Sequence, residues 1–128
     1  MDKIVHFEIP ADDVARAKAF YGSIFGWELN DVDMGGGAIY TTVITVPVGE
    51  DQLPKEPGAI NGGMMTRSAD VSSPVITINV ASIDDALKKV EASGGSVVTP
   101  RTPIPDMGAF AYFKDTEGNL MGLWENPS

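Results

Sequence analysis

The stretch Pro74–Gly95, PVITINVASIDDALKKVEASGG, contains a strand and then a helix with clear ends. Its β-branched residues predict a strand over Pro74–Val80. Ser82, with Asp85 three residues later, has the spacing of a capping box at a helix start. The glycines Gly94 and Gly95 predict where this helix ends. The apolar residues between them recur at i, i+3, i+4 and i+7, as on one face of an amphipathic helix: Ile83, Ala86, Leu87 and Val90.

The same order occurs earlier, over Lys3–Gly26, KIVHFEIPADDVARAKAFYGSIFG. Lys3–Ile9 reads as a strand, Asp12 or Asp13 as the N-cap of a helix, and Gly26 as its end. The apolar stripe of this helix is Val14, Ala17, Tyr21 and Ile24. A constant offset in numbering superimposes core positions of the two stretches: Phe7 on Ile76, Ile9 on Ile78, Val14 on Ile83, Ala17 on Ala86, Tyr21 on Val90 and Gly26 on Gly95. The chain is therefore predicted to be an internal repeat.

Each half continues with strand-like runs, which makes each a βαβββ unit. The runs are Trp27–Val32, Ala38–Val46 and Ala59–Thr66 in the first half, and Ser96–Thr99, Phe110–Lys114 and Asn119–Glu125 in the second. Pro47–Pro57 is expected to be a loop, and Arg67–Ser73 the linker between the halves. The prediction is one α+β domain over residues 1–128, built from two tandem βαβββ modules over about 1–67 and about 74–128.

Composition excludes several classes of protein. The chain has 128 residues, a net charge of −9 and no cysteine, so disulfides and thiolate catalysis are excluded. No apolar run approaches the roughly 20 residues of a membrane span, and no signal peptide is recognised. The negative charge disfavours nucleic acid. It either serves solubility alone or attracts a cationic small ligand. We expect a cytoplasmic protein that binds neither nucleic acid nor membrane.

Strand alternation predicts two different faces in each module. In the first strand Val5, Phe7 and Ile9 should pack under the helix, leaving Ile4, His6 and Glu8 on the opposite face. The second copy should place Ile76, Ile78 and Val80 toward its helix, and Val75, Thr77 and Asn79 away from it. Two such mixed faces opposed about a pseudo-twofold axis would form a cleft. The residues expected to contact a ligand there are His6, Glu8, Tyr40, Thr42, Met64, Val75, Thr77, Tyr112, Gly122 and Trp124.

Several of these residues have two interpretations. Gly122 inside the last strand either allows a close approach or marks a β-bulge. Trp124 is a ligand platform or a core or dimer-interface residue. Tyr40 and Tyr112 place hydroxyls at matching positions of the two halves, or are edge residues with hydroxyls in water.

The sequence resembles the vicinal oxygen chelate superfamily, the glyoxalase and bleomycin-resistance group. The resemblance lies in IVHFEIP at residues 4–10, AKAFY at 17–21, FGW at 25–27, DTEGN at 115–119 and GLWE at 122–125. It implies paired βαβββ modules that form a curved half-barrel sheet around a cleft, usually in a homodimer. Many members hold a divalent metal through residues on the first and last strands of each module.

The metal-ligand positions implied by the resemblance are mostly lost. His6 occupies the first of them, but Val75, Gly63 and Gly122 occupy the other three and cannot ligate a metal. Glu8 is the nearest further carboxylate, about 6–7 Å along the strand from His6. We therefore expect no metal ligands and no cofactor. His6 and Glu8 are the candidate catalytic acid and base, although His6 is equally interpreted as a structural histidine of the fold.

Three functions remain open from the sequence. The first is a metal-free protein of the bleomycin-resistance type, which holds a small, partly apolar and cationic molecule in the cleft between the modules. The second is a lyase or isomerase related to lactoylglutathione lyase that uses His6 or Glu8 as acid or base. The third is a structural or regulatory dimer module with a vestigial cleft.

Overall fold

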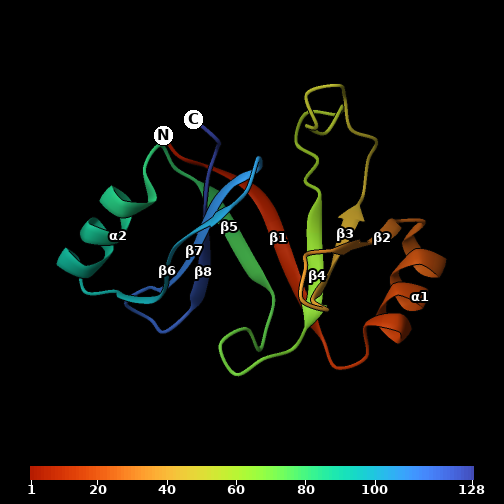
Figure 1. Cartoon of the computed structure of the whole chain (residues 1–128), viewed down its shortest axis with the longest axis horizontal. Helices are drawn as coiled ribbons and strands as arrows, with labels where there is room; N and C mark the ends of the chain where they lie inside the picture. Colours follow the sequence, from red (N-terminus) through yellow and green to blue (C-terminus); the bar gives the residue numbers. More distant parts are fainter. The chain divides into compact units, whose positions relative to one another are not determined.

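The computed structural model describes residues 1–128 as two βαβββ modules (Figure 1). The N-terminal unit is His6–Pro74, and the C-terminal unit is Val75–Ser128 together with Met1–Val5. The expected α+β class and the tandem modules are confirmed. The chain contains no helix long and apolar enough to span a membrane.

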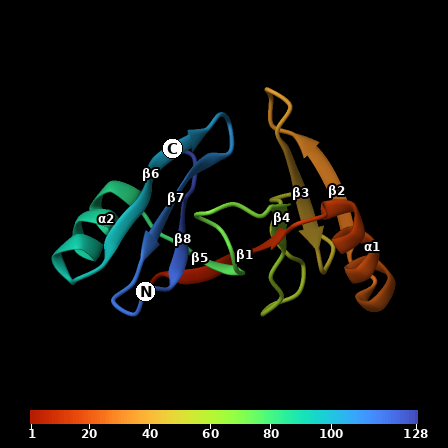
Figure 2. The same ribbon diagram turned by 90° about the horizontal axis from the view of Figure 1, so that it is seen from below.

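The N-terminal module consists of one helix on one face of a mixed four-stranded sheet (Figure 2). Its elements are β1 (Lys3–Ala11), α1 (Val14–Phe25), β2 (Glu28–Asp33), β3 (Ile39–Ile44) and β4 (Gly62–Thr66). The strand order is β2-β3-β4-β1. β1 runs parallel to β4, whereas the other neighbouring pairs are antiparallel. The parallel pair follows from the long excursion of the chain through α1, β2 and β3 between β1 and β4.

The C-terminal module repeats this topology with β5 (Val75–Asn79), α2 (Ile83–Ala92), β6 (Ser96–Ile104), β7 (Gly108–Lys114) and β8 (Leu120–Glu125). Its strand order, β5-β8-β7-β6, matches β1-β4-β3-β2 element for element. β5 is parallel to β8, and α2 lies on one face of the sheet (Figure 2). The internal repeat predicted from the sequence is therefore a repeat of topology as well.

Both helices begin and end where their sequences predict. The Asp13 carboxylate accepts a hydrogen bond from the backbone N–H of Arg16, and Gly26 ends α1 in the left-handed region at φ 71°. In α2 the Ser82 hydroxyl accepts from the backbone N–H of Asp85. A second partner at this end is Glu125 of β8, which accepts from the backbone N–H of Ile83 at 2.8 Å. Each contact satisfies an N–H group that the first helical turn leaves without an intrahelical acceptor.

Each module has its own apolar core between its helix and its sheet. In the N-terminal module Ala11, Val43 and Met64 are buried, and the predicted stripe residues Val14, Ala17 and Tyr21 pack on them. The fourth stripe residue, Ile24, is 55% exposed, so that prediction was wrong. It lies in the last turn of α1 and is not among the residues that pack on this core. In the C-terminal module the core consists of Val80, Ile83, Leu87, Ala109, Ala111 and Leu123.

The predicted direction of the side chains on β1 and β5 is confirmed where these strands lie under the helices. Phe7 and Ile9 pack into one core, and Ile78 and Val80 into the other. Val5 and Ile76 do not, because they are 38% and 45% exposed near the starts of their strands.

β6 is longer than the Ser96–Thr99 run predicted, since it continues to Ile104. Two register shifts against β7 lie at Val97–Thr99 and Thr99–Thr102. β6 stands at the edge of the sheet, a position that tolerates proline. Pro100 falls within the second register shift, whereas Pro103 pairs with Ala109 in regular register.

Candidate functional site

The open face of the N-terminal module, the face away from α1, carries the titratable residues of interest. His6 and Glu8 alternate along β1 with Phe7 and Ile9, which face the helix. On β3 the same alternation places Tyr40 on the open face, since Val43 is buried on the helix side. This geometry brings His6, Glu8 and Tyr40 together.

The three side chains form a hydrogen-bonded chain, called here the relay. The Tyr40 hydroxyl donates to Oε2 of Glu8 at 2.8 Å. Nε2 of His6 lies 3.0 Å from the same hydroxyl oxygen. A phenol has one proton, and here it is directed at the carboxylate, so Nε2–H of His6 must be the donor to Tyr40. The relay therefore fixes the histidine tautomer, with Nδ1 as the proton-acceptor nitrogen.

Gly63 of β4 provides the space that the relay occupies. In the ladder Gly63 is paired with Glu8 of β1 and with Thr42 of β3. A Cβ atom at Gly63 would lie 1.8 Å from the Tyr40 hydroxyl oxygen. No side chain fits there, so the tyrosine hydroxyl reaches the space between His6 and Glu8 only because residue 63 is glycine.

The environment of His6 favours its neutral form. Burial lowers the pKa of His6 below its ordinary value, and the nearby charge of Glu8 opposes this with a smaller raising effect. Every buried side-chain nitrogen or oxygen in the structure has a hydrogen-bond partner. Nδ1 of His6 makes no hydrogen bond within the protein and is not completely buried. The site thus presents an acceptor nitrogen on a ring held by Tyr40.

The lowered pKa of His6 predicts a pH dependence of stability. Between that lowered pKa and the ordinary value of 6.5 the unfolded chain binds more protons than the folded one. The free energy of unfolding should therefore fall as the pH drops below 6.5. His6→Asn should remove this fall, which urea denaturation at a series of pH values measures. An unchanged slope in the variant would contradict the assignment. Glu125, whose pKa is lowered chiefly by the Arg101 hydrogen bond, contributes only at more acidic pH.

The equivalent positions of the C-terminal module hold no such relay. Its ladder pairs Gly122 with Thr77 of β5 and Tyr112 of β7. The repeat therefore aligns Thr77 with Glu8, and Tyr112 with Thr42. Two residues earlier on the same strands, Tyr40 is aligned with Phe110 and not with Tyr112. With Val75 at the position of His6, this face contains neither an imidazole nor a carboxylate at the matching places.

Gly122 is regularly paired on both sides, which excludes the β-bulge interpretation. A Cβ atom there would lie 2.7 Å from the Thr77 hydroxyl oxygen. The close approach is therefore made by a threonine side chain of the same module, and Thr77 itself is only 6% exposed.

Other residues expected to contact a ligand have different surroundings. Met64 was wrongly placed: it is fully buried in the helix-side core, because it follows Gly63 and so points to the other face of β4. Val75 is 1% exposed and offers no ligand surface. The Thr42 hydroxyl donates to the Asn30 carbonyl oxygen. Trp124 is half-buried, donates from its indole N–H to Asn126 and covers Gly108.

The residues of the N-terminal module do not fit the divalent metal that the resemblance implies. No three His, Cys, Asp or Glu side chains are grouped as a metal site would require. His6 and Glu8 both bond to Tyr40, and the ligand position at residue 63 is filled by the tyrosine hydroxyl. Sequence reasoning noted Gly63 as a lost ligand, but not that its lack of a side chain admits Tyr40.

The chain is similar in sequence to several known proteins. The chain is 30% identical to the candidate glyoxylase CFP32 of Mycobacterium tuberculosis, over 92% of this chain and 43% of that protein. It is 31% identical to the anthracycline biosynthesis protein DauV of Streptomyces sp. strain C5, over 92% and 45%. A glyoxylase-like domain-containing protein of Didymella fabae is 29% identical over 98% and 94%. The chain thus spans less than half the length of CFP32 and DauV.

Solved structures share the fold at low identity. Methylmalonyl-CoA epimerase of Mycobacterium tuberculosis aligns with a TM-score of 0.66 at 16% identity, over 98% of this chain and 88% of that one. A hypothetical protein of Bacillus halodurans C-125 aligns with a TM-score of 0.68, also at 16% identity, over 99% and 96%. In sequence, residues 3–123 match the profile of one family. The chain belongs to the Glyoxalase/Bleomycin resistance protein/Dioxygenase superfamily.

Proposed function

We propose that this protein is a metal-independent small-molecule-binding protein whose ligand contacts the relay on the open face of the N-terminal module. One observation carries the proposal: the Tyr40 hydroxyl lies between His6 and Glu8, in the space left by Gly63. The two residues that would otherwise be free to ligate a metal are instead held by a neutral hydroxyl. They present a fixed polar surface to a ligand.

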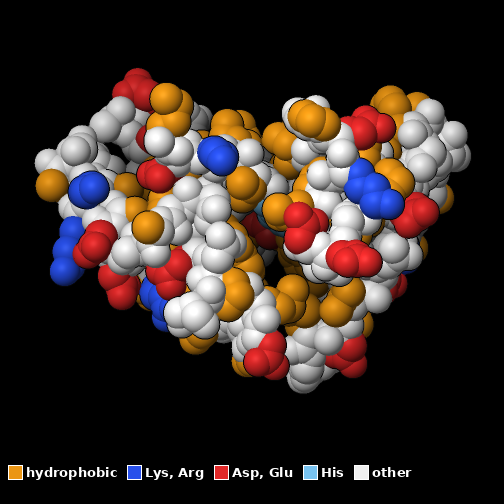
Figure 3. All heavy atoms as spheres, turned by 90° about the horizontal axis from the view of Figure 1, so that it is seen from above, with side chains coloured by type: hydrophobic (Ala, Val, Ile, Leu, Met, Phe, Trp, Pro, Cys, Tyr) orange, Lys and Arg blue, Asp and Glu red, His pale blue; other side chains and the backbone are white.

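The chemistry of that surface favours a ligand that donates protons or carries positive charge. Nδ1 of His6 accepts hydrogen bonds, and the neutral Tyr40 hydroxyl leaves the negative charge of Glu8 in place. The whole chain carries a net charge of −9, and acidic side chains are spread over the face seen in Figure 3. A cationic ligand is attracted over several ångströms by such a field before it makes contact.

The names of the relatives suggest a probe. DauV is named for anthracycline biosynthesis. An anthracycline is a planar, partly apolar aromatic molecule with a cationic amino sugar, and its aglycone is the same ring system without the charge. The pair separates the aromatic contribution to binding from the electrostatic one. Both probes are fluorescent, so binding is measured directly by titration.

The test compares Glu8→Gln with Glu91→Gln, which makes the same change of net charge at an exposed position of α2. Glu8→Gln should weaken binding of the cationic anthracycline roughly tenfold, as expected for loss of about 1.4 kcal/mol of charge attraction. Binding of the aglycone should change little, and Glu91→Gln should leave both affinities unchanged. Equal losses in the two glutamine variants would contradict the proposal.

A second candidate function is proton transfer, as in a lyase or isomerase. The observation that favours it is Nδ1 of His6, an acceptor nitrogen at the end of the relay that makes no hydrogen bond within the protein. A proton taken by Nδ1 makes an imidazolium whose Nε2–H still donates to Tyr40, and Tyr40 to the Glu8 carboxylate, which stabilises the charge. Incubation of the protein with the anthracycline in D₂O distinguishes the two functions. Binding alone leaves the C–H signals of the probe intact in the proton NMR spectrum, whereas proton transfer to and from its carbon atoms replaces them with deuterium.

A further inference from the structure

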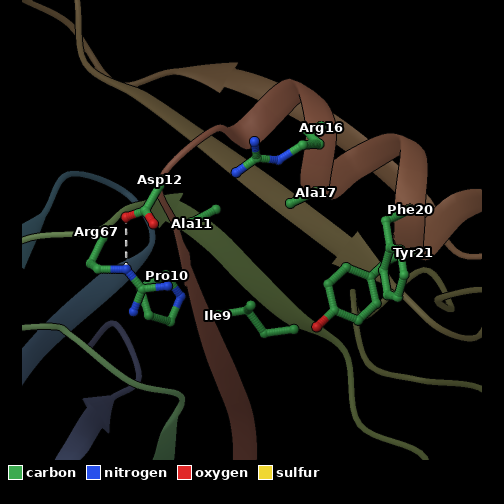
Figure 4. A pocket seen from close by; sticks show the side chains of 9 residues that line it. All are labelled: Ile9, Pro10, Ala11, Asp12, Arg16, Ala17, Phe20, Tyr21 and Arg67. Atoms are coloured by element: carbon green, nitrogen blue, oxygen red, sulfur yellow. Dashed lines mark hydrogen bonds and ion pairs between the residues drawn. The ribbon is translucent and has the colours of Figure 1, made fainter.

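The helix side of the N-terminal module contains a groove of about 310 Å³ between the end of β1, the start of α1 and Arg67 (Figure 4). It lies on the opposite side of the sheet from the relay, since Ile9 and Ala17 line it and both belong to the helix-side core. Neither the sequence motifs nor the relay accounts for it. Its lining residues all belong to the same module.

Hydrogen-bond donors outnumber acceptors among the side chains of the groove. Nε of Arg67 pairs with Oδ1 of Asp12 at 2.8 Å, and Nη1 of Arg67 donates to the Ser72 carbonyl oxygen. Asp12 and Arg67 thus neutralise each other. The Arg16 guanidinium makes no ion pair, and Figure 4 shows it extending from α1 toward the Asp12 end of the groove. Among the side chains that line the groove, one guanidinium is therefore without an ion pair, in a chain whose net charge is −9.

The remainder of the groove is apolar. Ile9 and Pro10 lie along β1, and the Phe20 and Tyr21 rings project from α1 at the other end (Figure 4). These rings are in edge contact with centroids 5.2 Å apart, and Phe20 is 54% exposed. The Tyr21 hydroxyl makes no hydrogen bond within the protein, so it is a further donor in contact with solvent. An apolar surface with donors at both ends matches a ligand with an apolar body and an anionic oxygen group.

We propose that this groove binds a small carboxylate with an aromatic or branched apolar body. The carboxylate lies between the Arg16 guanidinium and the Nη2 side of Arg67, where it accepts charge-assisted hydrogen bonds. The apolar body lies over Ile9, against the rings of Phe20 and Tyr21. This site is independent of the relay and takes a ligand of opposite charge, so either proposal stands if the other fails.

Phenylacetate is the probe, with phenylacetamide as its uncharged match. Amide chemical shifts in ¹⁵N-labelled full-length protein should change on addition of phenylacetate around residues 9–21 and at Arg67, and should not change for His6 or Tyr40. Phenylacetamide should bind at least several-fold more weakly. Arg16→Gln should weaken phenylacetate binding roughly tenfold, the effect of one charge-assisted hydrogen bond. Lys88→Gln, which makes the same change of net charge on exposed α2, should leave it unchanged.

The proposal is overturned by no shifts at millimolar phenylacetate, by equal affinity for the acid and the amide, or by equal affinity in the Arg16 and Lys88 variants. Shift changes confined to the open face would also overturn it, and would instead assign the probe to the relay. Arg16 is exposed and uses only its backbone N–H in the cap of α1, so Arg16→Gln is expected to fold normally.

Discussion

Gly63→Ala is expected to destabilise the protein by about 3 kcal/mol, the upper range for an overpacked site. The added methyl group would lie 1.8 Å from the Tyr40 hydroxyl oxygen and 2.1 Å from its Cζ atom, so the ring must leave. Its departure breaks both hydrogen bonds of the relay, with His6 and with Glu8. Urea denaturation of the wild type and the variant measures the loss. Binding of the cationic probe should be lost with the relay.

A double-mutant cycle assigns this effect to the tyrosine. In a Tyr40→Ala background the ring is absent, so Gly63→Ala should then cost less than about 1 kcal/mol. Gly22→Ala is the matched glycine control: a Cβ atom there meets only ordinary contacts at 3.6 Å or more, within α1. That variant should be neutral or more stable by up to about 1 kcal/mol. An undiminished cost of Gly63→Ala without Tyr40 would disprove the steric explanation.

Met64→Ala is expected to cost about 3 kcal/mol of stability, in the range measured for truncation of buried large side chains. Met64 is fully buried with Ala11 and Val43 between the sheet and α1. Met64→Leu, which nearly conserves volume, should cost less than about 1.5 kcal/mol. Urea denaturation ranks the three proteins.

The functional readout of the methionine variants separates a core residue from a ligand contact. For Met64→Leu the affinity for the anthracycline probe should equal that of the wild type, because the side chain does not reach the open face. A marked loss of affinity in this well-folded variant would return Met64 to the ligand-binding residues.

The sequence predicted the local features of the fold best. The N-cap of a helix and a glycine at its C-terminal end depend on only a few adjacent residues. The start and end of α1 were therefore predicted from Asp13 and Gly26, and the start of α2 from Ser82. The faces of β1 followed from alternation, which placed His6 and Glu8 together. Met64 was misassigned because its adaptable side chain was given more weight than alternation, although Gly63 on the open face already requires Met64 to point to α1.

The relay itself depends on pairing between distant segments. His6 and Tyr40 lie on strands that are separated in the sheet by β4, and their contact depends on the register of Gly63 with both neighbours. Matching by apparent position in the two halves paired Tyr40 with Tyr112. The strand pairing shows that Phe110 is the equivalent of Tyr40. Phe110 and Tyr112 are two residues apart on β7, so they share a face of the sheet but have different cross-strand neighbours.

The two prolines of β6 bear on how the folded protein behaves when it is concentrated. β6 is an outer strand, and an exposed strand edge is a template on which further chains assemble into fibrils. Pro100 and Pro103 have no backbone N–H to donate, and the two register shifts interrupt regular pairing between Val97 and Thr102. The other outer strand, β2, contains no proline but carries Glu28 and Asp33, whose carboxylates repel a second copy of the same strand. The outer edges of the two modules are thus protected against sheet extension in different ways: β6 by prolines that lack a backbone N–H, and β2 by charge repulsion.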